Sequence, residues 1–394
     1  FFLSIVIKNN HRREIGLLCF FKVFIFLAMV ILVAIGVAVY YFFFYTKPGE
    51  QPSAPQQQVG EFPTGENVAV IQERLARIST GEVVSPTSSA DGTKVLYLGK
   101  QRGIYESGFD GADLKEKPFA AQQNLHNVLW SADRNGIIAT YTNADGRKLF
   151  YYDLSQTTAT PYAPDVRWVS FEKNGAGIAY HQLDELAGVN AIAVARADGS
   201  SAQTVFPTRL KDVRLEFLAG GTIALWTAPS GFVESTLWSL DPATRKLSPV
   251  LANITGLTIA WSPDGEVLLY SQTAGGGKNL SLYAAAKDGT NVQQLGIATL
   301  PEKCAFANDA TSVVCAVPKT LPADLVWPDD YYKKLYTATE ELWQINVRTG
   351  AQNKLFEFPS SSFDATDLLL SPDDAALVFV NRKDGYLYSV KLTE

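Results

Sequence analysis

The sequence predicts an all-β fold, a seven-bladed β-propeller, preceded by one transmembrane α-helix. Three features support this: an uncharged apolar run near the N-terminus, a polar segment after it, and an apolar–turn–apolar phrase repeated through the rest of the 394 residues. The composition agrees, because 17 Tyr, 22 Phe and 29 Gly favour strands joined by tight turns. Six or eight blades are the alternatives to seven.

The apolar run covers residues 23–45 without a charged side chain. A helix of roughly 20 residues crosses a hydrocarbon core, so this run is long enough to span a bilayer. A buried soluble helix would show a polar stripe or a shorter run. A cleavable signal peptide is the other alternative, since Gly36 and Ala38 resemble a small-residue cleavage site, but its apolar region would be shorter. We expect a retained signal anchor whose partner is the lipid bilayer.

The charges around this run predict its orientation. Residues 1–22 carry four Lys or Arg side chains against one Glu, and basic flanks tend to stay in the cytoplasm. We therefore expect a single-pass membrane protein with a basic cytoplasmic N-terminal segment and an extracytoplasmic remainder. Removing this +3 from the formal net charge of −6 leaves −9 for the remainder, which disfavours nucleic acid as a partner.

Residues 46–65 separate the apolar run from the repeated part of the chain. They are rich in Pro, Gln and Gly and contain almost no large apolar side chain. Such a segment cannot bury a core and is expected to form an extended linker. Residues 66–394 then form the propeller.

The repeated phrase occurs seven times. Aligned on the turn, successive copies lie 42, 41, 46, 44, 45 and 64 residues apart, and a period of about 40–45 residues is typical of propeller blades with four strands each. The aligned turn positions are Asp91, Asp133, Asn174, Gly220, Asp264, Asp309 and Asp373.

The last copy ends after its third strand, whereas a weaker fourth strand follows in the other six. Residues 67–79 have apolar alternation and belong to no copy. A strand from this segment would complete the last blade and remove an exposed sheet edge. The ring is therefore expected to be closed by an N-terminal strand.

Three of the turn segments resemble a known family. The segments Trp130–Asp133 (WSAD), Trp261–Gly265 (WSPDG) and Leu370–Asp374 (LSPDD) are similar to the repeats of TolB-type, WD40-like (PD40) bacterial β-propellers, over roughly residues 67–394. The resemblance implies a propeller of the bacterial cell envelope. The chain departs from TolB in its seven copies, where TolB has six blades, and in lacking TolB's extra N-terminal domain, so TolB's partners are not carried over.

Motifs with catalytic or metal-binding chemistry are missing from the sequence. His11, His126 and His181 do not form an HExxH or other zinc spacing. No GxSxG elbow occurs, and Gly275–Lys278 (GGGK) lacks the remaining positions of a phosphate-binding loop. The sequence therefore predicts no catalytic, cofactor-binding or metal-ligating residues and no cofactor.

Two cysteines flank the turn of the sixth copy. Cys304 and Cys315 are expected to face each other across one hairpin. In an oxidising extracytoplasmic space they would form a disulfide. Two small buried apolar side chains are the equal alternative.

The long last interval contains an insertion that begins at Val317, between the second and third strands of the sixth blade. This connection is expected on the same face as the connections between blades, where partners usually bind. Its aromatic and acidic side chains form a candidate hot spot. The alternative is a loop that plugs the central channel or packs on the adjacent blade. The candidate partner-binding residues are Trp327, Asp329, Asp330, Tyr331 and Tyr332.

Two functions follow from these features. The first is a non-enzymatic interaction scaffold whose propeller docks an envelope protein or a cell-wall component. The alternative is a small-ligand or glycan-binding sensor or enzyme with a site in the central channel. His, Arg and carboxylate side chains converging on the channel mouth would favour the alternative, and the sequence offers Arg167 and Arg214 as scattered candidates.

Overall fold

The computed structural model describes residues 73–393, apart from gaps at 100–102, 118, 120–123, 145, 157, 174, 185–187 and 360–362. The predicted cytoplasmic segment, membrane anchor and linker (1–22, 23–45 and 46–65) lie outside the described residues. Within the described part of the chain, no helix is long and apolar enough to cross a membrane.

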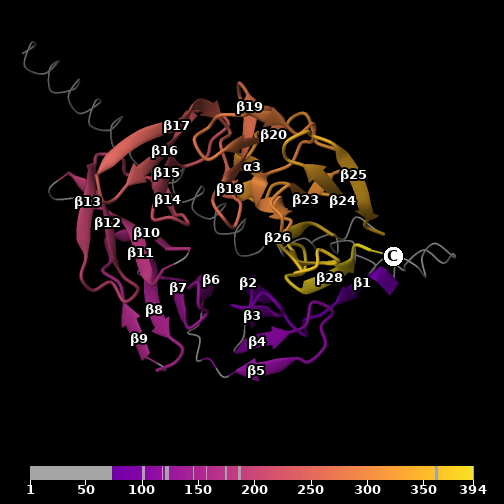
Figure 1. Cartoon of the computed structure of the whole chain (residues 1–394), viewed down its shortest axis with the longest axis horizontal. Helices are drawn as coiled ribbons and strands as arrows, with labels where there is room; N and C mark the ends of the chain where they lie inside the picture. Colours follow the sequence, from indigo (N-terminus) through magenta and orange to yellow (C-terminus); the bar gives the residue numbers. More distant parts are fainter. Residues whose placement is uncertain are drawn as a thin grey trace, which may run out of the picture. The chain divides into compact units, whose positions relative to one another are not determined.

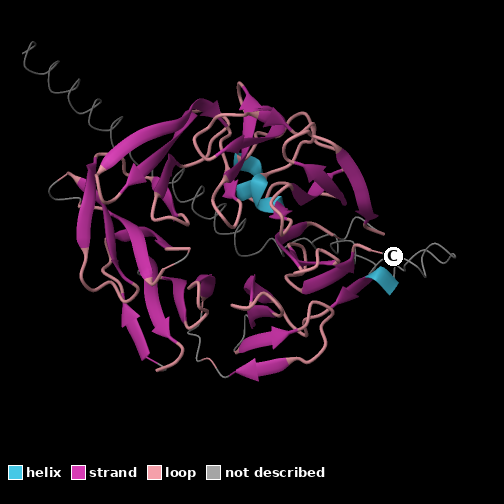
Figure 2. Ribbon diagram, viewed as in Figure 1, coloured by secondary structure: helices cyan, strands magenta, loops and turns pink. Residues whose placement is uncertain are grey.

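Seven four-stranded antiparallel sheets form a ring of blades, as predicted (Figures 1 and 2). Blades 1 and 2 contain β2 Val83–Ser88, β3 Val95–Gly99, β4 Ile104–Ser107 and β5 Lys115–Lys117, then β6 Leu125–Trp130, β7 Gly136–Asn143, β8 Gly146–Asp153 and β9 Thr158–Pro161. Blades 3 and 4 contain β10 Val166–Phe171, β11 Gly177–Gln182, β12 Asn190–Arg196 and β13 Gln203–Thr208, then β14 Val213–Phe217, β15 Ile223–Thr227, β16 Glu234–Asp241 and β17 Lys246–Thr255.

The remaining three blades complete the ring. Blades 5 and 6 contain β18 Ile259–Trp261, β19 Val267–Ala274, β20 Lys278–Ala286 and β21 Gln293–Gln294, then β22 Cys304–Phe306, β23 Ser312–Pro318, β24 Glu340–Asn346 and β25 Gln352–Glu357. Blade 7 contains β26 Ala365–Leu370, β27 Ala376–Asn381, β28 Leu387–Lys391 and, as its outer strand, β1 Leu75–Arg77. Two short helices, η1 Pro301–Lys303 and α3 Asp329–Tyr332, belong to the connections before β22 and before β24.

The N-terminal strand closes the ring in the predicted way. Leu75 pairs with Val390 and Arg77 pairs with Tyr388, so β1 runs antiparallel to β28. The Arg74 guanidinium adds a hydrogen bond of 3.0 Å to the carbonyl of Lys391. The last blade therefore takes its fourth strand from the start of the domain.

The turn between the first and second strands has the same two backbone hydrogen bonds in six blades, and in blade 4 it is one residue shorter, with the Leu218 amide donating to Thr222 O. In blade 5, the Ser262 amide donates to Val267 O and the Gly265 amide donates to Ser262 O, both at 2.9 Å. The Ser262 hydroxyl donates to Asp264 at 2.5 Å and thereby lowers the pKa of that carboxyl. The repeated Asp residue is thus a turn residue. The residues that begin these seven turns are Ser89, Ser131, Glu172, Leu218, Ser262, Ala307 and Ser371.

Successive strands alternate between two faces of the ring. We call the face with these seven turns the turn face, and the opposite face the insertion face, because residues 319–339 between β23 and β24 lie there. Each sheet begins with the strand that leads into this turn, so β2, β6, β10, β14, β18, β22 and β26 run from the insertion face to the turn face. Figure 1 shows the labelled strands of this set nearest the centre of the ring. The hydrophobic core lies between neighbouring blades, as where Leu98 of blade 1 packs with Ile137 of blade 2.

Candidate functional site

The insertion-face ends of the innermost strands form a central rim of mostly polar side chains. Counting four residues back from the start of each turn gives one equivalent position per blade. These positions occupy the same level of the seven blades, although two of their side chains are buried: the Thr258 hydroxyl is hydrogen-bonded to Ser271, and Lys303 is paired with Glu340 and Asp364. They are Ser85, Asn127, Trp168, Arg214, Thr258, Lys303 and Asp367.

Arg214 is stacked between two aromatic rings at this rim. Its guanidinium carbon lies 5.3 Å from the centre of the Trp168 ring and 5.5 Å from the centre of the Tyr332 ring. The Trp168 indole is itself fixed by a 3.0 Å hydrogen bond from Nε1 to Leu215 O. Among the described residues, no hydrogen bond or ion pair forms to the Arg214 guanidinium. Both rings are within cation–π distance of the guanidinium, and its N–H groups can still donate to an acceptor.

A second arginine, Arg147, approaches the same indole. The guanidinium carbon of Arg147 lies 5.9 Å from the Trp168 ring centre, and Arg147 Nη1 donates to Arg167 O at 2.6 Å. Burial lowers the pKa of Arg147, and the charge of Arg167 lowers it further. Positive charge is therefore concentrated at this part of the rim, where an anion would relieve the repulsion.

Two groups that resist ionisation complete the cluster. The Tyr332 hydroxyl and the Glu302 carboxyl are neighbours that influence each other's pKa. Desolvation raises the pKa of Glu302 above its usual value despite Tyr332 and Arg214; desolvation of the hydroxyl, together with Glu302, raises the pKa of Tyr332, although its ring remains partly exposed. Both groups therefore retain their protons to higher pH than usual beside a fixed cation.

The structure separates the five candidate partner-binding residues. Trp327 and Tyr331 are buried, at 4% and 8% exposure, and pack with Leu280 and Leu300. Tyr332 is 40% exposed and is the one that contacts Arg214. The two aspartates hold backbone amides: Asp329 accepts from Gly231 N at 2.7 Å, and Asp330 from Val326 N at 2.8 Å.

The insertion is thus packed against neighbouring blades. This agrees with the alternative to a partner-binding hot spot, namely a loop that packs on the adjacent blade. It contacts blade 4 through Gly231 and blade 5 through Gly277, whose carbonyl accepts from the Trp327 amide at 2.9 Å. Gly277 has a φ of +73°, and a side chain there would meet the Trp327 backbone within 2.9 Å. This close approach leaves room only for glycine. Figure 1 shows α3 inside the ring beside β18.

A buried charge network anchors the insertion below Tyr332. Lys303 Nζ lies 2.8 Å from Glu340 Oε1 and 2.7 Å from Asp364 Oδ1. Burial alone would lower the pKa of Lys303, but Glu340, Tyr331 and Asp364 outweigh it and raise the pKa. The Arg382 guanidinium lies 4.2 Å from the centre of the Tyr331 ring. Tyr331 is therefore held between two cations, and Tyr332 follows it directly in α3.

The two cysteines form a disulfide next to this network. Cys304 pairs with Cys315 across β22 and β23, as the register predicted, and their Sγ atoms lie 2.10 Å apart. The bond connects the strand that follows Lys303 to the strand that leads into the insertion. It therefore joins the two segments that supply Glu302 and Tyr332 to the rim.

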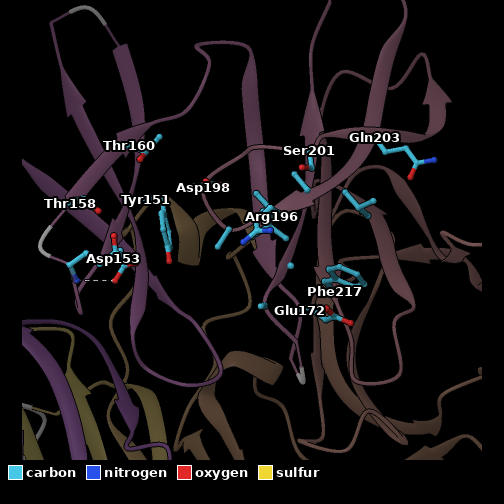
Figure 3. Close-up of a pocket in the computed structure, with 17 residues that line it drawn as sticks. Tyr151, Asp153, Thr158, Thr160, Glu172, Arg196, Asp198, Ser201, Gln203 and Phe217 are labelled. Carbon is cyan, nitrogen blue, oxygen red and sulfur yellow. Dashed lines mark hydrogen bonds between the residues drawn. The ribbon is translucent and has the colours of Figure 1, made fainter.

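The turn face carries a cavity of about 800 Å³ around blade 3 (Figure 3). Its lining includes Tyr151, Asp153, Glu172, Arg196 and Asp198. Two of these carboxylates are engaged in their own turns: Asp153 accepts from the Ser155 hydroxyl and Asp198 from the Ser200 hydroxyl, each at 2.6 Å. These hydrogen bonds lower the pKa of both aspartates. Their hydrogen bonds within the hairpin turns are sufficient to explain why aspartates occur at these two positions.

A metal centre does not fit the described side chains. Within the part of residues 73–393 that the structure describes, no group of three or more His, Cys, Asp and Glu side chains is arranged to hold a metal ion. His126 is exposed on β6, whereas His181 is buried on β11.

His181 makes the stability of the fold depend on pH. Its side chain is fully buried, and burial lowers its pKa, so the folded protein binds this proton less readily than the unfolded chain. The contribution of neutral His181 to the free energy of unfolding is therefore complete above the unfolded-state pKa of about 6.5, and it is lost as the pH falls below that value. We expect His181→Leu to flatten the pH dependence of the free energy of unfolding between about pH 7 and pH 5, measured by urea denaturation. His126→Leu, the exposed control, should keep the wild-type slope; an unchanged slope in His181→Leu would contradict the assignment.

The sequence alone identified Arg167 and Arg214 as scattered candidates but missed Trp168, Glu302 and Arg147. The signal that could have found part of the cluster is the repeat itself. Reading the residue four places before each turn gives Trp168, Arg214 and Lys303. Tyr332 was predicted as a partner-binding residue of the insertion, and no feature of the sequence indicates that it contacts Arg214.

No family model matches this chain, and no curated protein sequence matches it. Its fold is similar to that of an oligogalacturonate lyase solved in complex with manganese, at 13% identity and a TM-score of 0.59, over 81% of this chain and 93% of that one. An oligogalacturonate lyase from Vibrio parahaemolyticus gives 11% identity, a TM-score of 0.58 and coverage of 81% and 94%. The Cps50 (Swd1) β-propeller domain from Myceliophteria thermophila is similar at 12% identity and a TM-score of 0.53, over 81% of this chain and 100% of that one.

These comparisons correct the expected function. The two lyases are enzymes, and the likeness covers 93% and 94% of their chains, so the expectation of a non-enzymatic interaction scaffold gives way to the small-ligand or glycan-binding alternative. The expectation that the chain is not an enzyme loses its support for the same reason. At 11–13% identity the likeness establishes the fold alone. The chain is a seven-bladed β-propeller, and its TolB-type kinship remains a prediction.

Proposed function

We propose that this propeller binds an acidic oligosaccharide at the central rim of its insertion face. The observation that carries the proposal is the Arg214 guanidinium, stacked between Trp168 and Tyr332, with no hydrogen-bonding partner among the described residues. A guanidinium edge matches the two oxygens of a carboxylate in geometry and charge. Because the stacking fixes its orientation before binding, little further ordering is required.

The aromatic rings and the neighbouring arginines favour a sugar acid over a small free anion. Tyr332 is 40% exposed beside Arg214, so it offers apolar surface next to the cation. Pockets for organic ligands combine such surface with a few oriented polar groups. Arg147 adds a second cation near Trp168. The name of the similar lyases supports galacturonate oligomers as the first ligands to test.

Cleavage of the bound glycan is the second candidate function. It is favoured by Glu302 and Tyr332, whose raised pKa values keep protons available beside Arg214. A proton donor to a leaving oxygen needs a raised carboxyl pKa of this kind. Manganese, present in one of the similar lyases, does not fit the described residues of this chain, and no step is assigned to it.

The test is a comparison of two ligands that differ in charge. Full-length protein is titrated calorimetrically with trigalacturonate and with the matched neutral galactose trisaccharide. We expect the acidic trisaccharide to bind at least tenfold more tightly, and its binding to weaken as salt is added. Equal affinity for both would overturn the proposal. Release of new reducing ends in the same samples tests cleavage, which Glu302→Gln should abolish while binding persists.

A further inference from the structure

The exposed large apolar side chains of the described residues gather on one face of the ring. Of eight such side chains, six lie on the insertion face, in the connections of blades 3 and 4 and in the insertion itself. Single exposed apolar residues are common on folded domains, but their concentration on one face indicates an interaction surface. The six are Val189, Leu210, Phe232, Val233, Tyr332 and Leu335, and the other two, Leu114 and Val292, lie on the turn face.

Three of the segments that carry these side chains meet over blade 4. Residues 209–212 lead into β14 and residues 228–233 follow β15, and these two strands are paired. The second segment also contacts the insertion, because the Gly231 amide donates to Asp329 at 2.7 Å. We call residues 209–211, 232–233 and 332–335 together the blade 4 surface.

The tips of this surface are strongly exposed. Phe232, Val233 and Leu335 are 66%, 64% and 68% exposed, and these are the highest values among the exposed large apolar side chains of the described residues. Each of them would gain free energy by leaving water. The three tips come from two separate segments of the chain.

Basic side chains accompany the apolar ones. Leu210 and Leu335 each have two Lys or Arg residues within two positions in the sequence. Because a long basic side chain extends several ångströms from its backbone, these charges can reach past the apolar tips that they flank. The four cations, all exposed, are Arg209, Lys211, Lys333 and Lys334.

The charge balance gives this surface the opposite sign to most of the chain. The exposed carboxylates directly beside its segments are Asp212 and Glu234, so the cations are in excess. Among the described residues, Lys333 alone of the four cations has an acid within ion-pair distance, Asp330 at 3.9 Å. The chain after residue 22 carries a formal charge of −9. A partner that complements this surface is therefore anionic and accepts apolar side chains.

We infer that the blade 4 surface docks on an anionic lipid bilayer. Phe232, Val233 and Leu335 enter the boundary between headgroups and acyl chains, and the four cations stay at the level of the lipid phosphates. A protein partner would need a fitted pocket for each of these separate tips, whereas a bilayer accepts them in any arrangement.

Docking through this surface tilts the ring. On the insertion face of blades 1, 2 and 7, no described residue is an exposed large apolar side chain. That side of the ring has nothing to insert and stays away from the bilayer. The Arg214 rim therefore remains accessible from blades 1, 2 and 7, and docking is compatible with glycan binding.

The test compares two kinds of vesicle. Full-length protein is reconstituted in phosphatidylcholine alone or with an equal part of phosphatidylglycerol, and hydrogen exchange is followed by mass spectrometry. Any contribution of residues 23–45 is the same in both. We expect the amides of residues 228–233 and 333–337 to exchange roughly tenfold more slowly when phosphatidylglycerol is present.

Paired substitutions make the test specific to the apolar tips. Phe232→Ser combined with Val233→Ser should abolish the slowing at residues 333–337, which lie outside the substitutions. The matched control, Leu114→Ser combined with Val292→Ser, removes two exposed apolar side chains of the turn face. It should keep the wild-type slowing.

Three results would overturn the inference. The first is equal exchange in the two kinds of vesicle, and the second is slowing that survives Phe232→Ser with Val233→Ser. The third is slowing that also occurs in detergent without lipid and increases with protein concentration, because a second copy of the chain would then cover the surface. No glycan takes part in these measurements, so titration with trigalacturonate decides the proposed function separately.

Discussion

Replacing Arg214 with leucine is expected to weaken binding of trigalacturonate by roughly 10- to 100-fold, because a hydrogen bond to a charged group contributes about 1.5–3 kcal/mol. Leucine fills much of the space between Trp168 and Tyr332 but has no donor for a carboxylate. Arg214→Lys keeps the charge but loses the planar N–H edge, so its affinity for trigalacturonate should lie between those of the wild type and Arg214→Leu. Calorimetric titration measures all three proteins.

The control is another arginine on the surface. Arg196 lines the turn-face cavity of blade 3, and Arg196→Leu removes the same charge far from the rim. It should bind trigalacturonate as the wild type does. If Arg214→Leu remains folded by circular dichroism and binds as tightly as Arg196→Leu, the stacked guanidinium is not the binding group.

Replacing Lys303 with methionine should give the largest loss of stability. Glu340 and Asp364 are both fully buried and lie within 2.8 Å of Lys303 Nζ. Removing one partner of a buried ion pair leaves uncompensated charge and costs about 3–5 kcal/mol. We expect the free energy of unfolding to fall by this amount, measured by urea denaturation at neutral pH.

Two further variants make this prediction specific. Adding Glu340→Leu to Lys303→Met removes one stranded carboxylate and should recover part of the loss, since Asp364 keeps Arg382 3.9 Å away. Lys287→Met removes an exposed ion pair of 2.7 Å and should cost less than about 1 kcal/mol. A loss in Lys303→Met as small as that in Lys287→Met would show that the buried network contributes little.

The fold was predictable because its signals are local. Four of the seven turns are held by a Ser hydroxyl that donates to an Asp two residues later, such as Ser262 and Asp264, and the apolar–turn–apolar pattern around the turn recurs in all seven copies. The closing strand could be assigned because one blade had three strands and the apolar residues around Leu75 had no other partner. The register of Cys304 and Cys315 followed from the same hairpin geometry.

The candidate site was not predictable in the same way, because its contacts are not local. Trp168, Arg214, Glu302 and Tyr332 come from three blades and the insertion, and nothing in their sequence spacing indicates that they meet. The burial of Trp327 also depends on Gly277 of another blade. The membrane anchor at 23–45, the extracytoplasmic location and an envelope partner stay predictions.

The direction of β1 determines how the domain is presented. β1 runs away from the turn face and β28 runs toward it, and Arg74 meets Lys391 where the two strands begin and end. Glu73 and Arg74 accordingly line a cavity with Pro372 and Asp373 of the blade 7 turn. The first and last described residues of the propeller, Glu73 and Thr393, therefore lie together on the turn face. A linkage made at Thr393 would leave the Arg214 rim, on the opposite face, open to large ligands.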